Sequence, residues 1–101
     1  MNQISRIKKY ENILSISNKT INNLEKNIQA LKELEDDINS LNKYYGSNEW
    51  YQDINDDNLE LLPKDMNRGV LSEDGIYNML INHKEIAIEM LELATSILKN
   101  N

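Results

Sequence analysis

The sequence predicts an all-α protein in which a long N-terminal helix and a shorter C-terminal helix form an antiparallel, coiled-coil-like hairpin. A structured elbow with a short helix joins the two. Residues 1–43 contain neither glycine nor proline, and apolar residues recur at steps of three and four near both ends of the chain. No stretch alternates apolar and polar residues as a β-strand would. The length of 101 residues suits a single helical domain, residues 1–101.

The long helix is predicted over about residues 2–44. Its apolar residues advance by alternate steps of three and four, which is the heptad pattern of a coiled coil. This ridge consists of Ile7, Tyr10, Leu14, Ile21, Leu24, Ile28 and Leu31, with Ser17 in one of its positions. The next step, to Leu34, is again three, which predicts a stammer-like irregularity. A helix of about 40 residues extends about 60 Å, too far for one short helix to cover.

The elbow is predicted over residues 45–72. Gly46 ends the heptad pattern, and Ser47 is a suitable N-cap for a short helix that carries Trp50, Tyr51 and Ile54. Residues 55–62, rich in Asn and Asp, are predicted as a loop or a frayed helix end. Proline favours the first position of a helix and glycine the position after its end. Pro63 and Gly69 therefore predict a single helical turn between them.

The last helix is predicted over about residues 73–98. Ser72 is the expected N-cap, and two carboxylates in the first turn favour the helix dipole. Leu71 before the cap and Ile76 within the helix can form a hydrophobic staple. The apolar stripe is broad enough for more than one neighbour. It consists of Ile76, Leu80, Ala87, Met90, Ala94 and Ile97, widened by Met79, Ile86, Leu91, Leu93 and Leu98.

The elbow and its borders hold the candidate functional residues, which either bind a partner or stabilise the elbow. They are Tyr44, Tyr45, Trp50, Asp53, Arg68, Glu73, Asp74 and Tyr77. The aromatic residues either plug the open end of the hairpin or stand exposed as partner anchors.

Two further expectations concern the arginine and the glycines of the elbow. Arg68 is expected to bind Asp53, Glu49 or Glu73, or else an anion or a partner's carboxylate. Gly69 is expected at a positive φ. Gly75 costs about 1 kcal/mol relative to alanine inside a helix. It implies close packing against the aromatic cluster, or a ligand that approaches the backbone.

No residue pattern points to catalysis, to a metal or to a cofactor. His83 is the sole histidine, and no hydroxyl nucleophile neighbours it in the sequence. Asp53, Asn55 and Asp57 are spaced like the start of a calcium loop. Asn58, however, stands where that loop needs glycine, and Lys64 stands where it needs a bidentate glutamate. We therefore expect no catalytic residue, no metal site and no cofactor.

Charge divides the chain unevenly. Residues 1–32 carry a net charge of +4 and residues 33–101 carry −10, for a total of −6. An acidic chain argues against nucleic-acid binding, and the absence of a long apolar run argues against a membrane span. No signal peptide is evident, so the expected location is the cytoplasm. The expected partner is a second copy, with a dimer favoured, or another helical protein.

The elbow also carries a family resemblance. Four stretches of the sequence resemble a bacterial family catalogued as domain of unknown function 4298. They are Tyr44-Tyr45-Gly46-Ser47, Glu49-Trp50 with Asp53, Leu62-Pro63-Lys64-Asp65, and the run from Arg68 through Asn78 to Leu80. The resemblance implies a small stand-alone helical protein and no assigned activity. It covers roughly residues 44–80 in detail. Asn67 departs from it, because a Lys or Arg is expected before Arg68, and this puts in doubt any role that needs paired positive charges there.

Three functions follow as hypotheses. The first is a small non-catalytic protein that forms homodimers or binds another protein. The second is a substrate or helper of a specialised bacterial secretion system, whose members are helical hairpins with a Trp-Gly turn. Here Gly46 precedes Trp50 instead, and Ile81 stands where the export signal needs an acid after Tyr77. The third is a small-ligand-binding protein or an enzyme that uses the elbow as a pocket.

Overall fold

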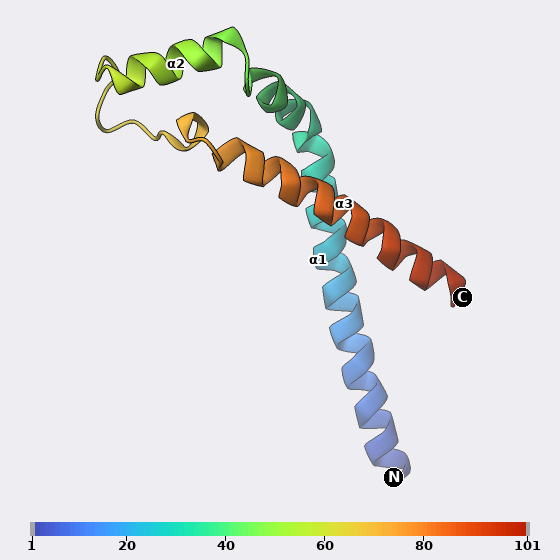
Figure 1. Ribbon diagram of the computed structural model, residues 1–101. Coiled ribbons are helices and arrows are strands. Elements are labelled where there is room, and N and C mark those ends of the chain that lie inside the picture. Colours follow the sequence, from blue (N-terminus) through green and yellow to red (C-terminus); the bar gives the residue numbers. More distant parts are fainter. Residues whose placement is uncertain (1, 101) are drawn as a thin grey trace. The chain divides into compact units, whose positions relative to one another are not determined.

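The computed structural model describes residues 2–100, and every regular element within that range is helical. In chain order these elements are α1 (Gln3–Tyr44), α2 (Asn48–Asn58), the short 3₁₀ helix η1 (Gly69–Leu71) and α3 (Gly75–Lys99) (Figure 1). The predicted all-α class is confirmed, with its long first helix, short elbow helix and shorter last helix. The chain divides into two compact units, before and after the Ile38–Asn39 junction. The antiparallel packing of α1 with α3 and the single-domain organisation stay predictions.

The first unit is the greater part of α1. This helix is one continuous ribbon, drawn from blue to green in Figure 1. At its start the Asn2 side chain accepts a hydrogen bond from the Ser5 backbone N–H at 2.7 Å, as an N-cap does. The less exposed positions between residues 27 and 39 are Ile28, Leu31, Glu35 and Ile38, which keep the alternate steps of three and four. Glu35, rather than the exposed Leu34, is the less exposed residue after Leu31 in the single chain, and the stammer in a coiled-coil seam stays a prediction.

The second unit begins at Asn39 with the last residues of α1 and continues through the junction between α1 and α2. Gly46 has a φ of +79°, which lets the chain leave α1 sharply. The Ser47 hydroxyl accepts a hydrogen bond from the Trp50 N–H at 3.2 Å and donates one to the Tyr44 carbonyl at 2.6 Å. The predicted Ser47 cap is confirmed. The helix continues to Asn58, so the first residues of the predicted 55–62 loop are helical, and Glu60 leaves with a φ of 61°.

The connection to α3 differs in two details from the prediction. The single helical turn expected between Pro63 and Gly69 is absent, and the helical turn lies instead at Gly69–Leu71. The last helix begins at Gly75 rather than Glu73, with Asp74 at the cap position. The Ser72 hydroxyl still accepts a hydrogen bond from the Gly75 N–H at 3.0 Å, and it donates one to the Gly69 carbonyl at 2.8 Å.

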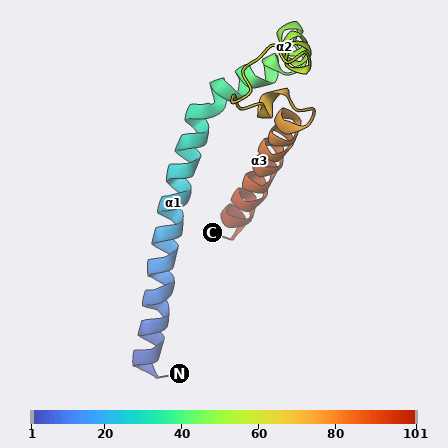
Figure 2. The ribbon, with the colours of Figure 1, turned by 90° about the vertical axis from the view of Figure 1, so that its left-hand side faces the viewer.

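A small core holds the second unit together. Trp50 of α2 and Ile76 of α3 are buried, with 7% and 2% of their surface exposed. η1 contacts both α2 and α3. Figure 2 looks nearly along α2 and shows η1 and the first turns of α3 beside it. The elbow is thus a compact structure formed by residues that follow one another closely in the sequence.

Candidate functional site

Trp50 is the centre of the elbow. Its indole N–H donates a hydrogen bond to the Val70 carbonyl at 2.8 Å, which joins α2 to η1. The Tyr45 and Tyr51 rings meet it edge-on, with ring centroids 5.0 Å and 5.1 Å away. Such T-shaped pairs stabilise by about 0.5–1.5 kcal/mol beyond the area they bury. Trp50 therefore fills the inside of the elbow, as the plug interpretation predicts for this residue.

Tyr44 and Asp53 form a hydrogen bond that joins the end of α1 to α2. The Tyr44 hydroxyl donates to a carboxylate oxygen of Asp53 at 2.6 Å, and both side chains are half-buried. This hydrogen bond, helped by burial and by the negative charges of Asp53 and Glu49, raises the pKa of Tyr44 to about 12. The phenol therefore acts here as a hydrogen-bond donor, and the contact fixes the angle at which α2 leaves α1.

Arg68 organises the loop between α2 and η1. Its Nε donates to Asp57 at 2.6 Å in an ion pair. Its other nitrogens donate to the carbonyls of Pro63, Lys64 and Met66. The predicted partners Asp53, Glu49 and Glu73 are wrong: α2 extends far enough to place Asp57 in front of the guanidinium, and Asp53 already binds Tyr44. Most of the donors of Arg68 are used within its own loop.

The two glycines of the elbow behave differently from the prediction. Gly69 does not have a positive φ, and an added methyl group there would meet open space. A methyl group on Gly75 would overlap the Gly69 carbonyl oxygen and lie 2.6 Å from the Ser72 hydroxyl oxygen. The close approach expected at Gly75 is therefore real, but its neighbours are the backbone of η1 and Ser72 rather than the aromatic cluster.

The eight predicted site residues do not form one cluster. Trp50 is buried, and Tyr44, Tyr45, Asp53 and Arg68 are half-buried with partners of their own. The other three, Glu73, Asp74 and Tyr77, are exposed. Tyr51, which the prediction placed on the short helix but not among the site residues, is also exposed on one side. Its position four residues after the Ser47 cap and directly after Trp50 was the signal available for it.

An apolar depression lies where η1 meets the start of α3. It is open to solvent and is lined by Leu41, Asn67, Gly69, Val70, Gly75, Ile76 and Met79. Because Leu41 and Ile76 line the same depression, the start of α3 lies beside the last turn of α1. His83, two turns farther along α3, is half-buried.

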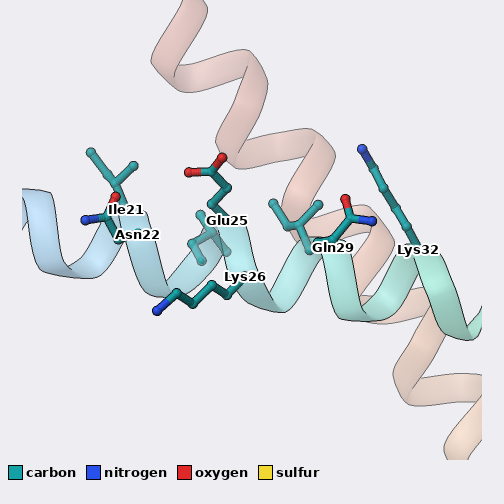
Figure 3. A pocket seen from close by; sticks show the side chains of 8 residues that line it. Ile21, Asn22, Glu25, Lys26, Gln29 and Lys32 are labelled. Carbon is teal, nitrogen blue, oxygen red and sulfur yellow. The ribbon is translucent and has the colours of Figure 1, made fainter.

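α1 presents a different kind of surface. Its first 14 residues carry six large apolar side chains with between 46% and 65% of their surface exposed: Ile4, Ile7, Tyr10, Ile13, Leu14 and Ile16. Farther along, an open depression is lined by eight residues of α1 itself: Ile21, Asn22, Leu24, Glu25, Lys26, Ile28, Gln29 and Lys32. Figure 3 shows Ile21, Glu25 and Lys32 extending to one side of the helix and Lys26 to the other.

A comparison with family models matches residues 7–93 to Domain of unknown function (DUF4298). The chain belongs to this family. The match takes in the whole elbow, all but the start of α1 and most of α3, well beyond the stretch on which the resemblance was first noted. A comparison with curated proteins gave no match. The DUF4298 assignment confirms the resemblance, and no function is assigned to this family.

Two further properties of this DUF4298 chain concern its chemistry and its surroundings. Between residues 2 and 100, no three His, Cys, Asp or Glu side chains gather closely enough to hold a metal ion. Over the same range, none of the helices contains a segment with both the length and the hydropathy that a bilayer crossing requires.

Proposed function

We propose that this DUF4298 protein is a small, non-catalytic interaction protein that binds a helix of another chain through the apolar face of α1. A second copy of the chain is the first candidate for that partner. The observation that carries the proposal is the row of exposed side chains on one side of the first turns of α1, formed by Ile4, Ile7, Tyr10, Ile13 and Leu14. Exposed apolar surface of this extent marks an interaction site more often than free protein surface.

The length of α3 supports a partner outside the chain. α3 has 25 residues, and its start lies beside Leu41. A helix rises about 1.5 Å per residue, so α3 running back along α1 would reach no farther than about residue 17. Residues 3–16 of α1 lie beyond that limit. Their apolar side chains therefore need cover from another molecule, whatever α3 does.

The elbow supports a non-catalytic role. Its strongest polar groups are used for structure: Tyr44 binds Asp53, the Trp50 indole binds Val70, and Arg68 binds Asp57 and three carbonyls. A catalytic pocket usually holds titratable groups in positions where they meet substrate. Tyr51 and Tyr77 remain exposed on the elbow as candidate secondary contacts with a partner.

The test uses two matched variants of α1. Leu14→Asp places a charge on the apolar face, and Asn12→Asp places the same residue two positions away, on the opposite face. Leu14 is already half-exposed in the isolated chain. The aspartate should therefore change the helix content of a single chain little, whereas a buried, unpaired charge should disrupt a complex.

Light scattering measures the mass of each protein, and circular dichroism checks its helix content. The proposal expects wild type and Asn12→Asp above monomer mass, or bound to a helical partner purified with them, and Leu14→Asp as a monomer. A wild-type protein of monomer mass that binds no partner at micromolar concentration would refute it. Equal association of all three proteins would place the interface elsewhere and refute the role of α1.

A further inference from the structure

The apolar ridge of α1 is open to solvent over only part of its length. From Ile28 onward the positions of the ridge are less exposed, and Ile38 is buried. Before Ile28, five large side chains of the ridge keep between 46% and 60% of their surface exposed: Ile7, Tyr10, Leu14, Ile21 and Leu24. The half-buried Ser17 stands among them. We call these six positions the open seam, because they are the part of the ridge that is free to contact another helix.

A parallel pair of α1 helices does not fit this division of the ridge. In a parallel, in-register pair each position faces its own copy, so Ile28 and Ile38 of the two chains would also face each other. α1 is one continuous helix as far as Tyr44, so two copies in contact at Leu24 stay close to each other beyond it. The groups that already cover these later positions in each chain would then lie between the two helices.

One antiparallel register uses the whole open seam and nothing beyond it. In this register, two-fold symmetry repeats each of three facing pairs: Ile7 with Leu24, Tyr10 with Ile21, and Leu14 with Ser17. α1 begins at Gln3, where the Asn2 side chain caps it, and Gln3 then lies opposite Ile28 of the second copy. Each helix therefore starts at the level where the less exposed part of the other ridge begins.

Antiparallel registers shifted by one heptad fit less well. A shift toward the elbow places Ile7 opposite Leu31, which is already less exposed within its own chain. A shift the other way places Ile21 opposite Gln3, so that Ile21 and the residues after it face no apolar partner. The register centred on the open seam is therefore the one that covers the most exposed apolar surface.

Ser17 is compatible with a central position opposite Leu14. Serine is small, so it leaves room for the facing leucine side chain. A serine hydroxyl inside a helix can donate to the carbonyl four residues earlier, as the Thr95 hydroxyl does to the Leu91 carbonyl in α3 at 2.8 Å. The hydroxyl of Ser17 therefore has a hydrogen-bond acceptor within its own helix when a second copy covers it.

The open depression on α1 in Figure 3 lies toward both ends of this pair. Ile21 is one of its lining residues, so the depression receives Tyr10 of the second copy. A side chain that enters a hollow between residues of the facing helix is the packing typical of coiled coils. The Tyr10 ring is covered there while its hydroxyl can stay in water at the edge.

The charges beside the open seam are a smaller influence. In the antiparallel register Arg6 lies level with Glu25 of the other copy. A parallel pair would place Arg6 near Glu11 instead, and it would bring Lys8 and Lys9 of both copies to the same level. All of these side chains are exposed, so each contact contributes little and is screened by salt. The direction of the pair is therefore decided by which part of the ridge is open.

From the position of the open seam, we propose that residues 7–24 of α1 pair antiparallel with the same residues of a second copy, with Ile7 facing Leu24 and Tyr10 facing Ile21. The pairing rests on the proposed function and names its partner. Residues 17–24 of each copy cover residues 7–14 of the other, most of which α3 of the same chain cannot reach. Residues 28–38 take no part in the contact.

The test exploits the absence of cysteine from the sequence. Tyr10→Cys and Ile21→Cys are prepared as separate variants, one of them lengthened by a tag so that mixed dimers can be recognised by mass. The two are unfolded together, refolded and oxidised in air, and each is also oxidised alone. A disulfide needs Cα atoms within about 7 Å. In the proposed register position 10 faces position 21, while equal positions lie about 16 Å apart along the helix.

The expected result is a disulfide-linked mixed dimer and little crosslinking of either variant alone. Ile7→Cys with Leu24→Cys should repeat this pattern. This second pair shows whether one altered layer has disturbed the fold, and circular dichroism checks each variant. Crosslinking of a single variant alone would show a parallel pair. A product of Leu14→Cys with Leu24→Cys would show the register shifted toward the elbow, and a product of Tyr10→Cys with Leu14→Cys would show the opposite shift.

Any of those three outcomes overturns the inference while the dimer of the proposed function stands. A wild-type dimer by light scattering, with no crosslink from either expected pair of variants, also overturns the inference. A wild-type monomer by light scattering, with no crosslink, removes both the inference and the second copy as the partner.

Discussion

The elbow and the first 14 residues of α1 differ in how far their large apolar side chains are removed from water. In the elbow and the first turn of α3, Trp50 and Ile76 are almost fully buried against neighbours in the same unit. The start of α1 has six large apolar residues, and each keeps nearly half of its surface exposed or more. The core of the elbow is therefore stabilised by contacts within the chain, whereas our proposal has the start of α1 covered by another molecule. Changes in the elbow should act at any protein concentration, and changes in α1 should act through association.

The largest expected effect is the loss of Trp50. Trp50→Ala removes the central side chain of the elbow together with its hydrogen bond to Val70. We expect a loss of about 3–5 kcal/mol in the free energy of unfolding, as for other buried aromatic residues. Urea unfolding followed by circular dichroism measures it. Tyr77→Ala is the matched control, because Tyr77 is half-exposed and its loss should cost about 0.5 kcal/mol or less.

The stability losses caused by changes in the elbow should not depend on protein concentration. The effect of Trp50→Ala should be the same in dilute and concentrated protein, because the contacts of Trp50 lie within the chain. Equal losses for Trp50→Ala and Tyr77→Ala would contradict the description of Trp50 as the core of the elbow.

The second effect concerns two glycines six positions apart. In an ordinary helix interior, Gly→Ala stabilises by about 1 kcal/mol. At Gly75 the new methyl group would overlap the Gly69 carbonyl, so we expect Gly75→Ala to destabilise by about 1–3 kcal/mol. Gly69→Ala meets open space and should leave the thermal unfolding midpoint nearly unchanged. A stabilised Gly75→Ala variant would show that η1 and α3 are not in close contact.

Local signals in the sequence predicted the helices well. The Ser47 cap depends only on residues three apart, and α1 depends on the heptad pattern and the absence of Gly and Pro. The errors lie where tertiary contacts decide. The partner of Arg68 depends on how far α2 extends, and Asp57 became available only because residues 55–58 are helical. The conformations of Gly69 and Gly75 depend on how η1 packs against α3, which no local pattern encodes.

A smaller effect should appear at high pH. The pKa of Tyr44 is raised from 10.0 to about 12 in the folded protein. Between these values the unfolded tyrosine loses its proton while the folded one keeps it. The stabilising contribution of Tyr44 is therefore fully present below pH 10 and is lost as the pH rises toward 12.

Tyr44→Phe tests this linkage. The variant removes the hydrogen bond to Asp53, which should cost about 1 kcal/mol at neutral pH. Its unfolding free energy, measured in urea from pH 9 upward, should fall less steeply with pH than that of wild type. Parallel curves for the two proteins would show that Tyr44 does not hold its proton through Asp53.

The most direct test of the contrast between the two regions is hydrogen exchange of backbone amides at two protein concentrations. Most of the stability of a helix in a protein comes from the packing of its apolar face, so the amides of residues 6–16 report whether their apolar side chains are covered. The predicted result is protection of these amides in concentrated protein that falls on dilution, while amides of the elbow near Trp50 keep theirs. Protection of residues 6–16 that is independent of concentration, or absent at every concentration, would contradict the dependence of α1 on a second copy.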